Sequence, residues 1–144
     1  MTTSEISIAE ARLESIKSGL MSAATIGAVA SMTTVFADWA RLPLSVPHSF
    51  LAWFVNVAVA IASGFFFGVT YRYIVRQDDN LHLGGGAVGA FAMVRSLAQI
   101  EANWDDSFTW LTWALIIGES FLWFVSARYA LDLAISKRWL MPID

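Results

Sequence analysis

The order of apolar and polar residues along the chain predicts four membrane-spanning helices. Almost uncharged runs occupy residues 18–38, 49–71, 81–100 and 108–131. Each run has about 20 residues or more, which is enough for a helix to cross ~30 Å of hydrocarbon. The runs are continuous rather than alternating, and a bilayer accepts only helices or a closed barrel, so we expect an all-α integral membrane protein. Short polar segments separate the runs and predict an up-down bundle of antiparallel neighbours.

A different pattern precedes the first run and predicts a separate N-terminal element. Within residues 1–17, apolar side chains recur at helical spacing, at Ile6, Ala9, Leu13 and Ile16. Ser7 followed by Glu10 matches a capping box, which starts a helix. We therefore expect a short amphipathic helix that lies on the membrane surface or against a partner, followed by a transmembrane domain over residues 18–144.

Composition supports this class and excludes several others. Hydrophobic residues make up 57% of the chain and charged residues only 15%, whereas soluble domains average ~25% charged residues. A net charge of −3 without a basic block leaves no electrostatic footprint for nucleic acid. The absence of cysteine excludes disulfides, thiol nucleophiles and thiolate metal sites.

The basic residues predict the orientation in the membrane. Four spans place both termini on one face, and seven of the nine basic residues fall there: Arg12, Lys17, Arg72, Arg76, Arg128, Lys137 and Arg138. The opposite face has Arg41, together with Arg95 if its side chain reaches that surface. The positive-inside rule then puts both termini in the cytoplasm, or in the stroma of a plastid.

Small residues predict where helices approach closely. Ala60, Gly64 and Gly68 are spaced by four in the second span, and Gly85 and Gly89 in the third. Such spacing lets helix backbones meet where lipid offers no hydrophobic driving force. We expect contacts within the bundle, with docking of a partner helix as the alternative. The motif Gly84-x-Gly86-x-x-Gly89 does not indicate a dinucleotide site, because a polar loop rather than a strand precedes it.

Two charged residues, Arg95 and Glu119, fall inside the predicted spans, and such residues are candidates for a functional site. Arg95 lies ~8 Å from the end of its span, so it can snorkel to water or meet Asn56 or Asp38. Glu119 lies ~18 Å deep, where the other helices offer Thr25 and Ser63. The difference of ~10 Å works against a direct ion pair. Three roles for Glu119 stay open: a neutral buried acid, which we expect, a pigment or cofactor ligand, or a proton or ion relay.

Other candidates lie at the ends of the spans. His48 and His82 can be pigment ligands like Glu119, with chlorophyll or carotenoid as the pigment, or ordinary surface histidines. Two histidines on opposite faces are too few for a zinc site, so we expect no metal centre. Arg72 and Arg76 share a helix face and suit anionic lipid headgroups or an acidic partner surface. No nucleophile–base set occurs, so we expect no catalytic residues and no enzyme activity.

Part of the chain resembles a known family. Residues 71–78 (YRYIVRQD), 86–91 (GAVGAF) and 94–97 (VRSL) are similar to a family of small polytopic membrane proteins of cyanobacteria and chloroplasts. The family has no established activity. The resemblance implies a thylakoid or plasma membrane and a link to photosynthetic complexes, with Arg72, Arg76 and Arg95 as the residues that carry it.

The sequence therefore favours a non-catalytic accessory subunit or assembly factor of a membrane complex, surrounded by lipids and by other integral membrane subunits, including those of a photosystem. Small size, short loops and abundant helix-docking surface support this prediction. The alternative is a small transporter or channel subunit in which Glu119 is the proton or ion site.

Overall fold

The computed structural model describes residues 3–42, 49–75, 81–102 and 109–140. Within these ranges the chain forms helices α1 (Thr3–Trp39), α2 (Phe50–Ile74), α3 (Leu81–Ala102) and α4 (Trp110–Ser136), with no strands. Each helix is long and apolar enough to cross a membrane. The prediction of an all-helical chain with four candidate spans is confirmed at this level.

The N-terminal region differs from the prediction. α1 is one continuous helix of 37 residues, about 55 Å long at 1.5 Å per residue, and no break separates residues 3–17 from the first span. Leu13 and Ile16 are exposed, whereas Ser15 and Ser18 are buried. The face of α1 that contacts the rest of the chain in this region is therefore made of small polar residues, because α2 approaches too closely for larger ones.

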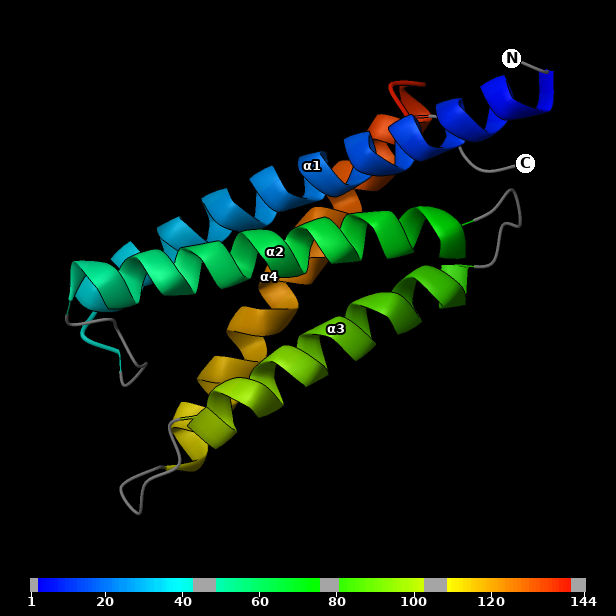
Figure 1. Ribbon diagram of the computed structural model, residues 1–144. Helices are drawn as coiled ribbons and strands as arrows, with labels where there is room; N and C mark the ends of the chain where they lie inside the picture. Colours follow the sequence, from blue (N-terminus) through cyan, green and yellow to red (C-terminus); the bar gives the residue numbers. More distant parts are fainter. Residues whose placement is uncertain (1–2, 43–48, 76–80, 103–108, 141–144) are drawn as a thin grey trace.

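The helices form two layers that cross (Figure 1). α2 packs along most of α1, and α3 packs mainly against α4. α4 crosses behind α2 and also contacts α1, whereas α1 and α3 do not touch within the described residues. The start of α1 and the end of α4 lie at the same end of the molecule. The crossing brings α4 into contact with all three other helices.

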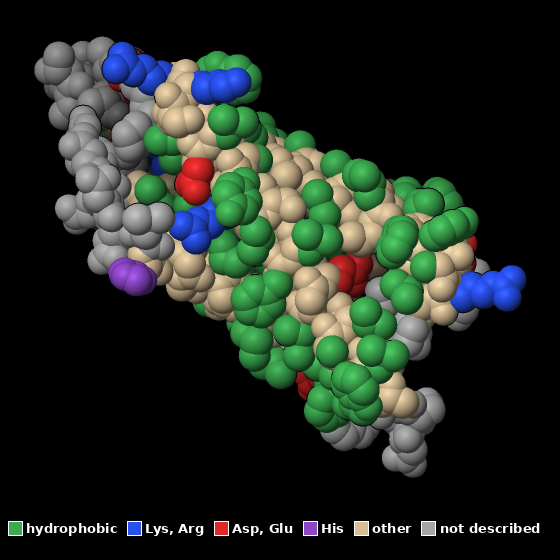
Figure 2. Space-filling view, turned by 180° about the vertical axis from the view of Figure 1, so that it is seen from behind, with side chains coloured by type: hydrophobic (Ala, Val, Ile, Leu, Met, Phe, Trp, Pro, Cys, Tyr) green, Lys and Arg blue, Asp and Glu red, His purple; other side chains and the backbone are tan. Residues whose placement is uncertain are grey.

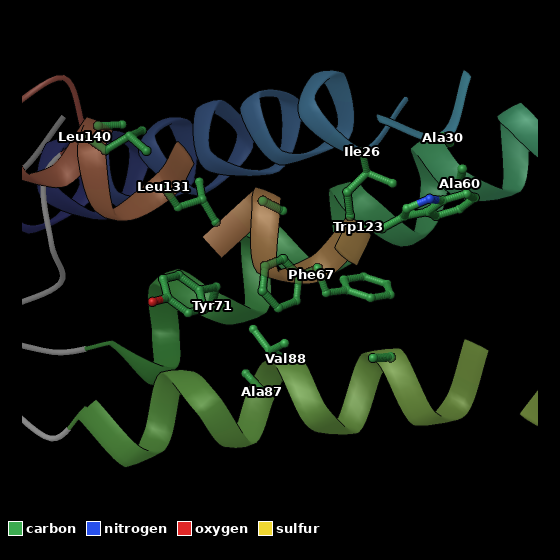
Figure 3. Packing of buried hydrophobic residues seen from close by; sticks show 14 residues of the cluster. Ile26, Ala30, Ala60, Phe67, Tyr71, Ala87, Val88, Trp123, Leu131 and Leu140 are labelled. Atoms are coloured by element: carbon green, nitrogen blue, oxygen red, sulfur yellow. The ribbon is translucent and has the colours of Figure 1, made fainter. Parts of the chain in front are cut away.

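The core lies where α4 crosses the other helices (Figure 3). Phe67 of α2 is fully buried, with ring centroids 5.4 Å from Phe91 of α3 and 5.2 Å from Phe124 of α4. Tyr71 and Trp123 are the largest buried side chains beside this group. Aromatic pairs at these distances stabilise beyond their buried area, so the three-helix junction is held by ring packing.

The outer surface is apolar, as expected for a chain surrounded by lipid. Phe54, Phe66, Val94 and Leu122 are all exposed. Figure 2 shows hydrophobic side chains and backbone over the middle of one face, with Lys and Arg toward its ends. Such a surface is unusual for a soluble monomer and marks contact with a membrane or with other proteins.

The two glycine seams have different surroundings. A Cβ on Gly68 would collide with the Ser18 backbone oxygen, and one on Gly64 would lie 3.0 Å from the Cα of Ala23. This seam, which includes the buried Ala60, lets α1 and α2 meet backbone to backbone. On α3, by contrast, a Cβ on Gly86 or Gly89 would meet nothing within 4 Å.

Among the described residues, the Gly85–Gly89 seam therefore makes no contact between helix backbones. Its nearest feature is the Arg128 guanidinium, 3.6 Å from a Cβ placed on Gly85. The expectation of a close backbone contact here is wrong, because α3 packs through the buried Gly84, Ala87, Val88 and Ala92 and leaves Gly85 and Gly86 exposed and Gly89 half-buried.

Candidate functional site

Side chains from all four helices converge in the interior and form what we call the interior polar cluster: Thr33, Asn56, Arg95, Glu119 and Trp123. Counted at 1.5 Å per residue from the nearest helix end, its four polar residues lie roughly 9–14 Å deep. The cluster is thus within the apolar part of the bundle, where polar groups are costly and point to function.

Thr33 is at the centre of the hydrogen bonding. Its hydroxyl donates to Glu119 Oε1 at 2.8 Å and accepts from Trp123 Nε1 at 3.1 Å. The same hydroxyl also lies 3.1 Å from the Ala30 carbonyl. Since a hydroxyl carries one hydrogen, Thr33 can donate it to a carboxylate, or to Ala30 when Glu119 is protonated. The site therefore accommodates either protonation state of Glu119.

Arg95 lies over the face of the Trp123 ring, whereas Thr33 meets the Nε1 edge of that ring. The Cζ atom of Arg95 is 3.7 Å from the Trp123 ring centroid, and Nη2 is 3.5 Å from Asn56 Oδ1. Nε is buried and has no hydrogen-bond partner. Arg95 as a whole is only 9% exposed, so it does not snorkel to water. It meets Asn56, one of its two expected partners, while a cation–π contact compensates part of its lost hydration.

Arg95 and Glu119 interact electrostatically without direct contact. Arg95 feels the charge of Glu119, yet the ion pairs found among the described residues do not include these two. Trp123 and Thr33 lie between them. The two residues are closer in depth than the predicted ~10 Å, because α4 starts at Trp110 and crosses its neighbours obliquely.

The partner of Glu119 also differs from those considered on the sequence. Thr25 donates within its own helix, to the Met21 carbonyl at 2.9 Å, and Thr33, two turns further along α1, takes its place. Trp123, one turn after Glu119 in α4, was not identified on the sequence. A tryptophan four residues after an acid inside a span is the sequence pattern that could have identified it.

Arg72 has an internal role. It is 4% exposed, and Nη1 donates to the Ala11 carbonyl and to Ser15 Oγ, both at 2.6 Å. This placement ties the end of α2 to the first part of α1 and does not support the predicted contact with lipid or a partner. Arg76, predicted to act with it, lies outside the described residues.

The structure does not bring the predicted pigment ligands together. His82 is exposed at the start of α3, about 20 Å along the helix from Arg95 and so from the interior polar cluster. His48 lies outside the described residues. In the part of the chain that is described, no group of three His, Cys, Asp or Glu side chains can hold a metal ion.

A second polar group, not predicted from the sequence, joins three helices near the other end. The Tyr71 hydroxyl donates to Asp132 Oδ1 at 2.6 Å, and Arg128 Nε lies 3.5 Å from Asp132 Oδ2. A Cβ on Gly84 would be 2.9 Å from the Tyr71 hydroxyl. Glycine at this position therefore gives Tyr71 the space to reach across to α4.

No protein-family model, curated protein or solved structure matches this chain. The interior polar cluster is consequently interpreted from its own chemistry. It holds the cation Arg95 and the acid Glu119, which are linked through the Thr33 hydroxyl and the Trp123 indole. Its members provide no nucleophile–base geometry. Such an arrangement can lock four helices together and can hold or release a proton at Glu119.

Proposed function

We propose that the chain is an accessory subunit or assembly factor of a larger membrane complex, an up-down bundle with both termini on the cytoplasmic or stromal side. The observation that carries the proposal is the open seam on α3. Gly86 and Gly89 have free space where a side chain would stand, although glycine weakens a helix by about 1 kcal/mol relative to alanine. A close contact with a neighbouring helix of another chain would offset this cost.

The contrast between the two seams strengthens the proposal. The α2 seam at Gly64 and Gly68 is filled by the α1 backbone, so this chain does use small residues for close helix contacts. The α3 seam has the same spacing but faces outward. The resemblance of residues 71–97 to small membrane proteins of photosynthetic organisms includes this seam and favours a thylakoid or plasma-membrane complex.

The experiment is purification from native membranes in a mild detergent, followed by measurement of the mass of the complex that contains the chain. We expect Gly89→Leu to shift the chain from the large complex to the free form, because the side chain blocks close approach. Val94→Leu, at an exposed position five residues further along α3, is the matched control. Equal complex mass for both variants would refute the proposal.

The orientation has a separate test, made simple by the absence of cysteine. Ser136→Cys and Glu101→Cys place single exposed thiols at opposite ends of the bundle. An impermeant maleimide added from the cytoplasmic or stromal side is expected to label position 136 and not 101. This follows from the basic residues near the termini, and the reverse labelling would overturn the orientation.

A second candidate function, a transporter or channel subunit, is favoured by one feature of Glu119. Glu119 is partly exposed, and its Oε1 accepts a hydrogen bond from the Thr33 hydroxyl, a geometry suited to reversible protonation. Proton flux into proteoliposomes that is lost in Glu119→Gln would support it. An absorption band that co-purifies with the chain and is lost in the same variant would instead assign Glu119 to chlorophyll or carotenoid binding.

A further inference from the structure

One of the two carboxylate oxygens of Glu119, Oε2, accepts no hydrogen bond from the described residues. Oε1 accepts the Thr33 hydrogen bond, while Oε2 has no hydrogen-bond donor among the described residues. Glu119 is partly exposed on α4, so a neighbouring molecule can reach its side chain. An acceptor without a donor costs several kcal/mol in hydrocarbon, which makes this oxygen a place where a neighbour is needed.

The surface beside Glu119 gives a neighbour access. Ala114 and Gly118 form the exposed side of α4 next to it, and a Cβ on Gly118 would meet nothing within 4 Å. The exposed Leu111 and Leu122 flank this side of α4, so the open space is confined to the turn around Ala114 and Gly118. The carboxylate of Glu119 defines the site. The small residues only permit a neighbouring helix to come within hydrogen-bonding distance of that carboxylate.

The charges already present at the site determine which kind of hydrogen-bond donor a neighbour can bring to Glu119. The interior polar cluster already contains Arg95, whose positive charge acts on Glu119. A cationic side chain from a neighbour would leave a net positive charge in a medium of low dielectric constant, at high cost. A neutral donor, such as the side chain of Asn, Gln, Ser or Thr, satisfies Oε2 without adding charge.

The same reasoning disfavours a second copy of this chain. A twofold crossing at Gly118 would place the two Glu119 carboxylates next to each other, and like charges repel strongly where water is excluded. We propose that Glu119 Oε2 is a docking point for a transmembrane helix of a different protein that presents a neutral hydrogen-bond donor. This inference rests on the proposed function and names the chemistry of the partner.

The experiment measures binding of defined helices to the full chain in phosphatidylcholine vesicles. A donor dye is attached through Ser136→Cys, and acceptor-labelled leucine-rich transmembrane peptides carry Asn, Lys or Leu at the centre. We expect energy transfer to show the Asn peptide binding about 5- to 30-fold more tightly than the Leu peptide, the range of an interhelical hydrogen bond in model membranes. The Lys peptide is expected to bind no better than the Leu peptide.

Two variants test whether the preference for the Asn peptide arises at Glu119. Glu119→Leu removes the acceptor and is expected to abolish the preference for Asn. Gly118→Leu leaves the interior polar cluster intact and blocks access, so it is expected to reduce the preference while the chain stays folded by circular dichroism. Ala24→Leu, at an exposed small residue on α1 outside both proposed docking surfaces, is the matched control and is expected to bind as the wild type does.

Several outcomes overturn the inference. Equal binding of the Asn and Leu peptides removes the docking point, tighter binding of the Lys peptide contradicts the charge argument, and strong energy transfer between copies of the chain shows that a second copy is the occupant. Failure of the chain to remain in carbonate-washed vesicles would refute the proposed membrane function itself. Failure of the docking point and failure of the proposed membrane function are therefore distinguishable.

Discussion

The α1–α2 seam allows a test in which two similar substitutions change the free energy of unfolding in opposite directions. Gly68→Ala adds one methyl group where the Ser18 backbone oxygen and the Ser22 Cβ, 2.7 Å away, already occupy the space. Gly86→Ala adds the same group on α3, where nothing lies within 4 Å. Both variants exchange glycine for alanine inside a helix, so a difference between them isolates the packing contribution.

The magnitude follows from three contributions. Alanine stabilises a helix by about 1 kcal/mol relative to glycine, and overpacking costs about 1–3 kcal/mol. In Gly68→Ala the displacement also stretches the hydrogen bond from Ser18 Oγ to the Gly68 carbonyl, now 2.7 Å, worth about 0.6 kcal/mol in a membrane. We expect Gly68→Ala to lower the free energy of unfolding by roughly 0.5–2.5 kcal/mol and Gly86→Ala to raise it by up to about 1 kcal/mol.

The assay is equilibrium unfolding in mixed micelles, in which dodecyl sulfate is titrated into dodecyl maltoside. Tryptophan fluorescence reports the transition, since the buried Trp123 becomes exposed when the helices separate. The reasoning is refuted if Gly68→Ala is as stable as Gly86→Ala, because α1 and α2 would then not meet backbone to backbone.

Three further variants test the polar contacts in the same assay. Tyr71→Phe removes the hydrogen bond to a carboxylate on α4 and should cost about 1.5–3 kcal/mol, whereas Tyr129→Phe, at an exposed position, should change stability by less than about 0.5 kcal/mol. Arg72→Gln should speed amide hydrogen exchange in the first turns of α1, because the arginine holds that region to α2; unchanged exchange would contradict this role. An ionised Glu119 predicts that Glu119→Gln destabilises the fold and that adding Arg95→Gln recovers part of the loss, with a coupling energy of about 0.5–3 kcal/mol, whereas the neutral acid expected from the sequence predicts little change. Additive effects would show that the two charges do not interact across Trp123.

The existence of the helices follows from the sequence because it depends on local composition. Any run of about 20 apolar residues favours a spanning helix, whatever its neighbours are. The predicted span 49–71 corresponds to α2 at Phe50–Ile74, and 81–100 to α3 at Leu81–Ala102. The merging of residues 1–17 into α1 is the exception, because a helical period does not show where one helix ends and the next begins.

The partners of each polar side chain depend instead on helix rotation and crossing angle, which no single run of residues encodes. The sequence indicated that Glu119 and Arg95 are important and set them ~10 Å apart in depth. The oblique crossing of α4 brings both to Trp123 and selects Thr33 as the hydrogen-bond donor. The same crossing turns Gly68 inward and Gly86 outward, because only tertiary packing decides which face of a helix meets its neighbour.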